Sequence, residues 1–257
     1  MIDIHCHILP NMDDGSKSWE DSLEMCRMAA KDGVTDIIAT PHFGMIFYQY
    51  KVEDIRKVVR LLNSHLENQK IPLRVHSGAD VALDAGALEW ARRGDLPTLA
   101  DGNRYFLLEP PDSIRADGLD QMIFDFKVMG LTPIITHPER MSVGKDWDWL
   151  ERLLEMGCLC QITAMSITGG FGRPARKNAL RLLEKGLVHF VASDAHSPRG
   201  RTPILSQARE ELLDLVGPEQ TLLLLKTAPQ AVLDGQALDF PAPAPPARRS
   251  WFARLLG

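Results

Sequence analysis

The stretch Ile2-Asp3-Ile4-His5-Cys6-His7 opens the chain and combines a short apolar strand pattern with two histidines spaced two residues apart. Side chains two apart in an extended strand point the same way, so His5 and His7 project together. The stretch Ser193-Asp194-Ala195-His196 repeats this spacing near the other end of the sequence. Two such pairs at opposite ends of the chain indicate a single site that the whole fold assembles.

Further short β-branched or apolar runs follow, separated by segments with helical periodicity. We expect one helix to begin after an N-cap at Ser18 and to end near Gly33, and another to end at Gly217-Pro218. Short strands that alternate with helices indicate an α/β fold, a parallel sheet with crossover helices. The seven expected strands are residues 2–5, 36–40, 73–77, 105–108, 132–136, 159–163 and 189–192.

Polar residues gather at the carboxyl ends of these expected strands. Enzymes built on βα barrels place their sites at that end, so we favour closure of the seven expected strands into a TIM-like βα barrel. An open, doubly wound sheet is the alternative. The length of 257 residues suits a single barrel domain.

Strong metal-ligating side chains recur at the ends of successive expected strands. A lone His-x-His or a lone Asp is weak evidence, because such an Asp is more often a helix N-cap. The recurrence carries the prediction, and mixed imidazole and carboxylate ligands suit Zn²⁺, Mn²⁺ or Fe²⁺ better than Ca²⁺ or Mg²⁺. Nine candidates imply two or three ions; they are His5, His7, Asp14, His42, Asp80, Glu109, His137, Asp194 and His196.

Two arginines, Arg140 and Arg201, lie just beyond candidate ligand positions. A guanidinium beside a metal cluster is suited to bidentate binding of a phosphate, so the pair favours an anionic substrate such as a phosphate ester. A surface ion pair is the alternative for either arginine alone. No Cys-x5-Arg, Gly-x-Ser-x-Gly or Walker-type loop accompanies them, so the chemistry is expected to depend on metal.

The composition of the chain limits the binding partners and the cellular compartment that we expect. The net charge of -5 gives no general basic surface, so nucleic acid is not expected. The four cysteines lack Cys-x-x-Cys spacing, and we expect free, mostly buried thiols. With no leader-like start and no apolar run of membrane-spanning length, we expect a soluble, cytoplasmic protein.

Residues 240–257 differ from the rest of the chain. A Pro-rich segment, 240–246, leads into a basic stretch containing Trp251, Phe252, Leu255 and Leu256. We expect a flexible tail here; a short amphipathic helix that contacts a partner or an anionic membrane surface is the alternative.

The motifs MIDIHCHILP (1–10), MDDG (12–15), ATPH (39–42), HPER (137–140) and ASDAH (192–196) resemble the polymerase and histidinol phosphatase (PHP) superfamily. More narrowly, they resemble its bacterial tyrosine-phosphatase branch from capsule and exopolysaccharide clusters. GGFGR (169–173) and TAPQAVL (227–233) add to the match. The resemblance covers roughly residues 1–235, and we expect a phosphatase domain at 1–239 followed by the tail.

This resemblance implies a distorted seven-stranded βα barrel that holds three divalent ions, often manganese. It implies hydrolysis of phosphotyrosine on the tail of a bacterial tyrosine autokinase that controls polysaccharide export. By this resemblance the candidate ligands other than Asp80 would bind metal, and Arg140 and Arg201 would hold phosphate, with Arg140 also helping the leaving group. Independently of the resemblance, we expect that His42 or Asp14 could act as general acid if it is not fully committed to metal. The family usually has Glu where this chain has Asp80, and this shorter carboxylate puts the affinity of one ion in question.

Two other functions remain open at this stage. One is a PHP-type phosphoesterase for a small phosphate such as histidinol phosphate, or a nuclease-like enzyme. The other is a metal-bound scaffold that binds a kinase tail without turnover. Outer helices could also assemble a homo-oligomer, although the Leu-rich stretch Leu222–Leu225 is explained equally well by docking onto the barrel.

Overall fold

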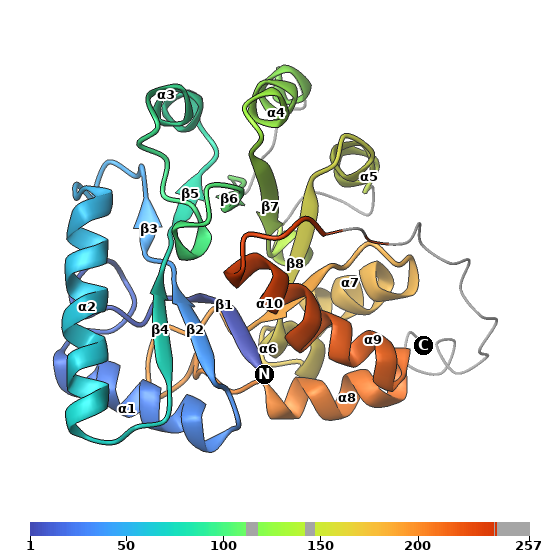
Figure 1. Cartoon of the computed structure of the whole chain (residues 1–257). Helices are drawn as coiled ribbons and strands as arrows, with labels where there is room; N and C mark the ends of the chain where they lie inside the picture. Colours follow the sequence, from blue (N-terminus) through green and yellow to red (C-terminus); the bar gives the residue numbers. More distant parts are fainter. Residues whose placement is uncertain (112–117, 142–146, 239, 241–257) are drawn as a thin grey trace.

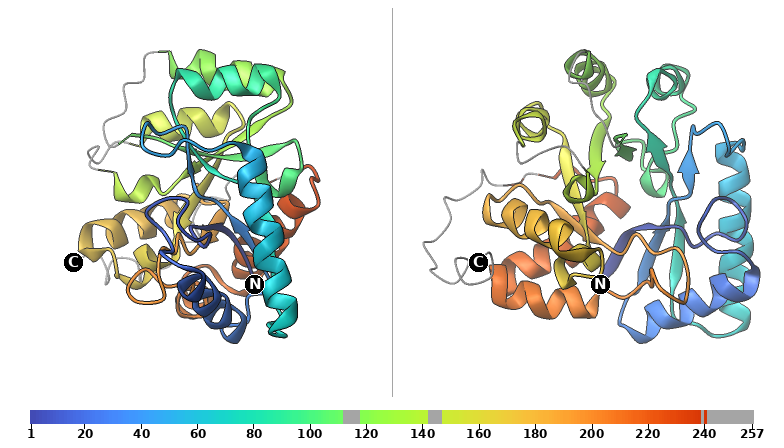
Figure 2. Two further views of the ribbon diagram at one scale, coloured as in Figure 1. Left: turned by 90° about the vertical axis from the view of Figure 1, so that its left-hand side faces the viewer. Right: turned by 180° about the vertical axis from the view of Figure 1, so that it is seen from behind.

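The computed structural model describes residues 1–111, 118–141, 147–238 and 240, and all of its strand pairs are parallel. One sheet has the order β1-β2-β4, and the other has the order β3-β5-β6-β7-β8-β9. Helices lie around the outside of the strands (Figures 1 and 2). The α/β class is confirmed. The strands are β1 (Ile2–Cys6), β2 (Asp36–Ala39), β3 (His42–Phe43), β4 (Arg74–Ser77), β5 (Asp80–Ala82), β6 (Tyr105–Glu109), β7 (Thr132–Thr136), β8 (Leu159–Thr163) and β9 (Phe190–Ala192).

Two of the expected strands are each followed at once by a further short strand. The chain leaves β2 at Ala39 and enters β3 after Pro41, and it leaves β4 at Ser77 and enters β5 after two small residues. Pro41 has no N–H to donate to the ladder, which explains the first break. The sequence prediction missed β3 and β5, and His42 and Asp80 lie opposite each other within these strands rather than after them.

Hydrogen bonds also join the last strand to the first. The backbone N–H of Asp194 donates to the carbonyl of His5 at 2.8 Å, and that of His7 donates to the carbonyl of Ala195 at 2.8 Å. Counting β2 with β3 and β4 with β5, the strands then follow one another from β1 to β9 and return to β1. This ring-like order is the one that the expected distorted seven-stranded barrel requires.

Helix α1 (Trp19–Lys31) shows how closely the sequence signals match the structure. Ser18 caps it by accepting a hydrogen bond from the N–H of Asp21, and Gly33 follows its end with a φ of 87°. Helix α8 (Ser206–Val216) likewise ends at Gly217, as expected. The remaining helices are α2 (Val52–Asn68), α3 (Ala85–Arg93), α4 (Leu119–Val128), α5 (Asp148–Glu155), α6 (Ala164–Thr168), α7 (Gly172–Glu184), α9 (Pro218–Leu222) and α10 (Ala228–Leu233).

Alternating strand residues divide the core into two clusters. In β6, Tyr105 and Leu107 join one cluster, whereas Phe106 and Leu108 join the other. The first cluster includes residues of α10, which lies across the strands near their amino ends (Figure 1). Burial of this apolar surface holds the strands in place and leaves their carboxyl ends for polar side chains.

All four cysteines are free and buried. Leu224 and Leu225 are buried, so this part of the Leu-rich stretch docks onto the barrel, while Leu222 is 54% exposed. Within the described ranges, no helix is both long and apolar enough to cross a membrane. Most of the predicted tail, residues 241–257, lies outside the described residues.

Candidate metal centre

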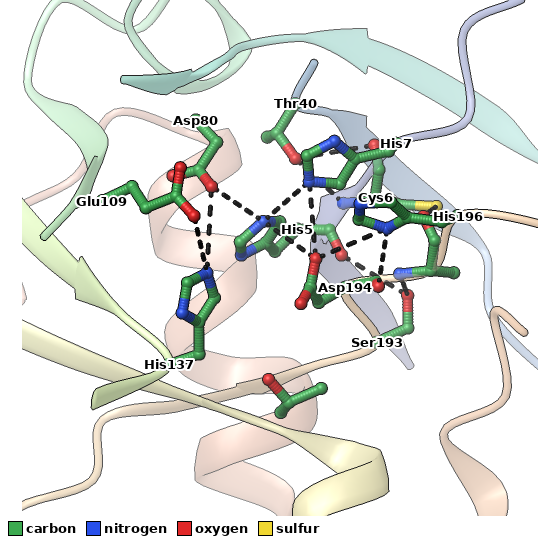
Figure 3. A network of polar contacts seen from close by, with 12 residues as sticks. His5, Cys6, His7, Thr40, Asp80, Glu109, His137, Ser193, Asp194 and His196 are labelled. Atoms are coloured by element: carbon green, nitrogen blue, oxygen red, sulfur yellow. Dashed lines mark hydrogen bonds and ion pairs between the residues drawn. The ribbon is translucent and has the colours of Figure 1, made fainter. Parts of the chain in front are cut away.

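The structure brings all nine predicted ligands together at the carboxyl ends of the strands. His5, His7, Asp80 and Asp194 are almost completely buried, whereas the Asp14 side chain is 52% exposed at the edge of the cluster. Figure 3 shows how the imidazole and carboxylate groups point toward one another. Parallel strands place their carboxyl ends at a single edge, which is why residues so distant in sequence meet here.

His5, His7 and Asp194 form the centre of the cluster. The Nε2 atoms of His5 and His7 lie 3.2 Å apart, so the two side chains project together where β1 ends at Cys6. Oδ1 of Asp194 lies 3.4 Å from each of these two nitrogens. One carboxylate thus faces two imidazoles in a buried position.

Asp80 occupies the other side of His5. Its Oδ2 lies 3.4 Å from Nε2 of His5, 3.8 Å from Nδ1 of His42 and 3.9 Å from Nε2 of His137. Glu109 completes this side, with Oε2 at 3.1 Å from Nδ1 of His42 and Oε1 at 3.5 Å from Nε2 of His137. A single oxygen of Asp80 is therefore close to three imidazoles, as a bridging carboxylate would be.

The outer edge is formed by Asp14, His42 and His196. Oδ1 of Asp14 lies 3.5 Å from Nε2 of His42 and 3.4 Å from Nε2 of His196. Asp14, His196 and Arg201 line a cavity of about 340 Å³ together with Lys17. The buried cluster therefore opens to a space that can receive a ligand.

Several atoms of the cluster that could bind metal are buried and make no hydrogen bond within the described residues. They are both carboxylate oxygens of Asp80, Nδ1 of His42 and Oε2 of Glu109. Buried polar atoms without partners are costly, and a bound cation would relieve that cost. Groups of at least three donors with ligating atoms within 4.8 Å of one another are His7-Asp14-His42-His196, His5-His7-Asp80, His5-His137-Asp194 and His42-Asp80-Glu109.

The electrostatics of the carboxylates agree with this arrangement. Burial raises the pKa of the Asp194 carboxyl, but His5, His7 and Arg140 outweigh burial and hold that pKa well below its usual range. Burial and the neighbouring Asp80 raise the pKa of Glu109. Negative charge is thus concentrated in a buried space, where it attracts divalent cations.

Two of the candidate ligands have unusual backbone conformations. His137 has a φ of 34° and Asp194 has a φ of 50°, both in the left-handed region that residues other than glycine rarely adopt. Strain of this kind persists where the surrounding structure fixes it, and it clusters at functional sites. Both residues begin the loops that carry the two candidate phosphate-binding arginines.

Sequence reasoning missed the residues that orient the ligands. Oδ2 of Asp13 lies 2.6 Å from Nδ1 of His7 and also accepts a hydrogen bond from the N–H of His42 at 3.0 Å. Oε1 of Gln161 lies 3.0 Å from Nδ1 of His5. Ligating histidines commonly use the second ring nitrogen in this way. The MDDG motif includes Asp13, but the sequence prediction assigns a role only to its neighbour Asp14.

The two arginines converge on one carboxylate. Nη1 of Arg140 lies 2.7 Å from Oδ2 of Asp194, and Nη2 of Arg201 lies 2.5 Å from the same oxygen. Both guanidinium groups also lie over the ring of Phe171. The predicted phosphate-binding pair is therefore assembled beside the metal cluster, facing the same ligand.

Comparison with known proteins agrees with this site. The family model described as capsular polysaccharide synthesis, CpsB/CapC, matches residues 1–234. The chain is 36% identical to the tyrosine-protein phosphatase YwqE of Bacillus subtilis over 98% of this chain and 99% of that protein. It is 35% identical to the putative tyrosine-protein phosphatase CapC of Staphylococcus aureus, over 80% of this chain and 81% of that protein.

The chain is also similar to solved structures. A chain from the crystal structures of YwqE from Bacillus subtilis and CpsB from Streptococcus pneumoniae, described as unique metal-dependent tyrosine phosphatases, superposes with a TM-score of 0.89 at 36% identity. The superposition covers 97% of this chain and 100% of that one. Histidinol phosphate phosphatase from Lactococcus lactis matches with a TM-score of 0.53 at 10% identity, covering 88% and 96% of the two chains, which shows a shared fold. The chain belongs to the CpsB/CapC family of capsular polysaccharide synthesis.

Proposed function

We propose that this protein is a metal-dependent protein-tyrosine phosphatase. The observation that carries the proposal is the placement of two arginines against a buried cluster of imidazoles and carboxylates that fits divalent ions. The similarity to YwqE over nearly the whole chain supports the same reaction class. We assign the activity to a catalytic domain of residues 1–239, and we expect that this activity does not require the tail at 240–257.

The nine clustered residues would hold two or three divalent ions, with Mn²⁺ as the favoured metal and Zn²⁺ or Fe²⁺ as alternatives. Ions at such a site polarise phosphoryl oxygens and make water a nucleophile at neutral pH. The chain would contribute the orientation of each ligand: Asp13 would fix His7, and Gln161 would fix His5. Asp80, close to three imidazoles, would be one of the carboxylates that hold the ions.

Arg140 and Arg201 would bind the equatorial oxygens of the phosphoryl group. Their N–H donors form a planar fork that matches phosphate, and they would stabilise the charge that these oxygens carry in the transition state. If His42 or Asp14, at the outer edge of the cluster, is not fully committed to metal, it would be the group that protonates the leaving tyrosinate. Tyrosinate is a comparatively good leaving group, so this assistance need not be strong.

We further propose that the substrate is the phosphotyrosine tail of a tyrosine autokinase, through which the enzyme would regulate capsular or exopolysaccharide synthesis in the cytoplasm. The family assignment supports the capsule context. A homo-oligomer formed through the outer helices is compatible with large apolar side chains that remain exposed, such as Phe124 on α4 and Leu222 on α9. The tail could contact a partner or a membrane surface.

Relative kcat/KM values test this proposal. A Tyr-rich peptide should be hydrolysed in its phosphotyrosine form at least about a hundredfold more efficiently than histidinol phosphate, since a pocket that recognises the aryl group discriminates by several kcal/mol. A preference for histidinol phosphate would favour the small-molecule phosphoesterase instead. Stoichiometric metal without hydrolysis of either substrate would favour the scaffold.

A further inference from the structure

Phe171 lies where both candidate phosphate-binding arginines meet. The guanidinium carbon of Arg140 is 4.8 Å from the centre of the Phe171 ring, and that of Arg201 is 5.5 Å from it. Both distances are within the range in which a cation over an aromatic face is attracted by the ring. One ring therefore contacts two positive charges that come from distant parts of the chain.

The turn that carries Phe171 explains the GGFGR motif. Gly169 ends α6 and Gly172 begins α7, and both have a φ of 88°, a conformation that side chains strongly disfavour. The N–H of Gly172 donates to the carbonyl of Gly169 at 2.9 Å, which closes the turn around the Phe171 backbone. The glycines thus allow a tight turn between α6 and α7 that contains Phe171.

The same turn is tied to the segment that carries Arg140. Oε1 of the buried Glu139 accepts hydrogen bonds from the N–H of Thr163 at 2.9 Å and from the hydroxyl of Ser166 at 2.7 Å. Ser166 belongs to α6, the helix that leads into the turn. Arg140 and Phe171 are therefore linked twice, through the backbone anchored by Glu139 and through the contact of guanidinium and ring.

Contact with a ring suits a phosphate-binding arginine for a chemical reason. A guanidinium binds phosphate through its five N–H donors, whereas a phenyl ring attracts the positive charge and offers no oxygen or nitrogen acceptor. A ring contact therefore fixes the side chain without using any of the donors that a phosphate needs. Two neighbouring cations also repel each other, and the negative face of the ring offsets part of that repulsion.

We propose that Phe171 is a positioning residue for phosphate recognition, which holds Arg140 and Arg201 side by side so that both donate to one phosphoryl group. This inference rests on the proposed function, because it assigns these arginines to the substrate phosphate. It gives the GGFGR motif a role that the metal cluster does not explain. Phe171 acts through the arginines and touches no reacting atom.

The test compares Phe171→Leu, which keeps an apolar side chain and removes the ring, with Phe171→Tyr, which keeps the ring. Phe124→Leu, at an exposed position on α4, is the control for loss of an aromatic elsewhere. We expect Phe171→Leu to raise both the KM for a phosphotyrosine peptide and the Kd for inorganic phosphate about fivefold to thirtyfold, the range set by one or two such contacts. Phe171→Tyr and Phe124→Leu should stay within about twofold of the wild type.

A second comparison separates positioning from a general structural effect. In an Arg140→Ala, Arg201→Ala background, Phe171→Leu should weaken phosphate binding no further, because no guanidinium remains to be held. An equal loss in both backgrounds would overturn the inference, as would wild-type phosphate affinity in Phe171→Leu. If the wild type hydrolyses no phosphotyrosine, the proposed function fails. Calorimetry with inorganic phosphate then decides the inference about Phe171 separately: it fails if Phe171→Leu binds phosphate as tightly as the wild type does.

Discussion

Oδ2 of Asp13 lies 2.6 Å from Nδ1 of His7, on the opposite side of the imidazole from the nitrogen that faces the cluster. Burial lowers the pKa of His7, but Asp13 and Asp194 outweigh burial and raise that pKa to about 10 when only protein groups are present. The same carboxylate accepts from the N–H groups of Gly15 and His42. Asp13 thus fixes His7 and joins the loop after β1 to the start of β3.

The first prediction concerns metal affinity. Asp13→Ala should weaken binding of Mn²⁺ about tenfold to a hundredfold, because partners of a ligating histidine typically contribute that much. Asp13→Asn can still accept a hydrogen bond from His7, so its affinity for Mn²⁺ should lie between those of Asp13→Ala and the wild type. Competition with a chelator of known affinity measures the effect. Unchanged affinity in Asp13→Ala would contradict the assignment.

The second prediction concerns the arginine fork. Arg140→Ala should lower kcat/KM for a phosphotyrosine peptide about a hundredfold or more, which is typical when a donor to transition-state charge is removed. Arg140→Lys should recover only part of this loss, because an ammonium group cannot bind two oxygens in the same plane. Arg92→Lys, at the exposed end of α3, serves as the control. Full activity in Arg140→Lys would show that charge alone suffices.

The third prediction concerns stability. Ions that bind the folded cluster and not the unfolded chain should stabilise the protein by about 2.7 kcal/mol at a free concentration one hundred times Kd. Chelation should therefore lower Tm, and Mn²⁺ should restore it. In Asp80→Asn the increase with Mn²⁺ should shrink, since this carboxylate lies beside three imidazoles. A Tm insensitive to metal in the wild type would argue against a site in this cluster.

The fourth prediction concerns pH and lies far from the metal centre. Burial lowers the pKa of the His189 imidazole from 6.5 to about 4. Between these values the unfolded chain binds the proton and the folded chain does not, so stability falls as pH drops from 6.5 toward 4, by up to about 3 kcal/mol. His189→Gln should flatten this part of the unfolding profile, measured by urea denaturation across that range. A profile that keeps its full slope in His189→Gln would contradict this prediction.

Most of the candidate site could be predicted from the sequence because its ligands recur at strand ends. His137 and Glu109 follow runs of apolar residues whose strand conformation is unambiguous, and so their place in the fold follows from the barrel geometry. The short strands at His42 and Asp80 could not be predicted in the same way. Each spans only two or three residues, and pairing with a neighbouring strand, not local propensity, fixes it.

Orienting residues were harder to predict for a different reason. Gln161 and Phe171 contact residues that are remote in the sequence, His5 and Arg140. Asp13 contacts the ring nitrogen of His7 that points away from the cluster. A glutamine in the middle of the apolar strand β8 was a usable signal, because a buried polar side chain requires a partner. The partner itself, His5, could be named only from the structure.

If this cluster makes the chain a metal-dependent tyrosine phosphatase, its activity must depend on bound metal. The most direct measurement is phosphate release from a phosphotyrosine peptide by metal-stripped protein, with and without added Mn²⁺, beside His5→Ala. We expect no release without metal, restored release with Mn²⁺ in the wild type, and little restoration in His5→Ala. Release that is equally fast in the stripped protein, or that survives in His5→Ala, would contradict this expectation.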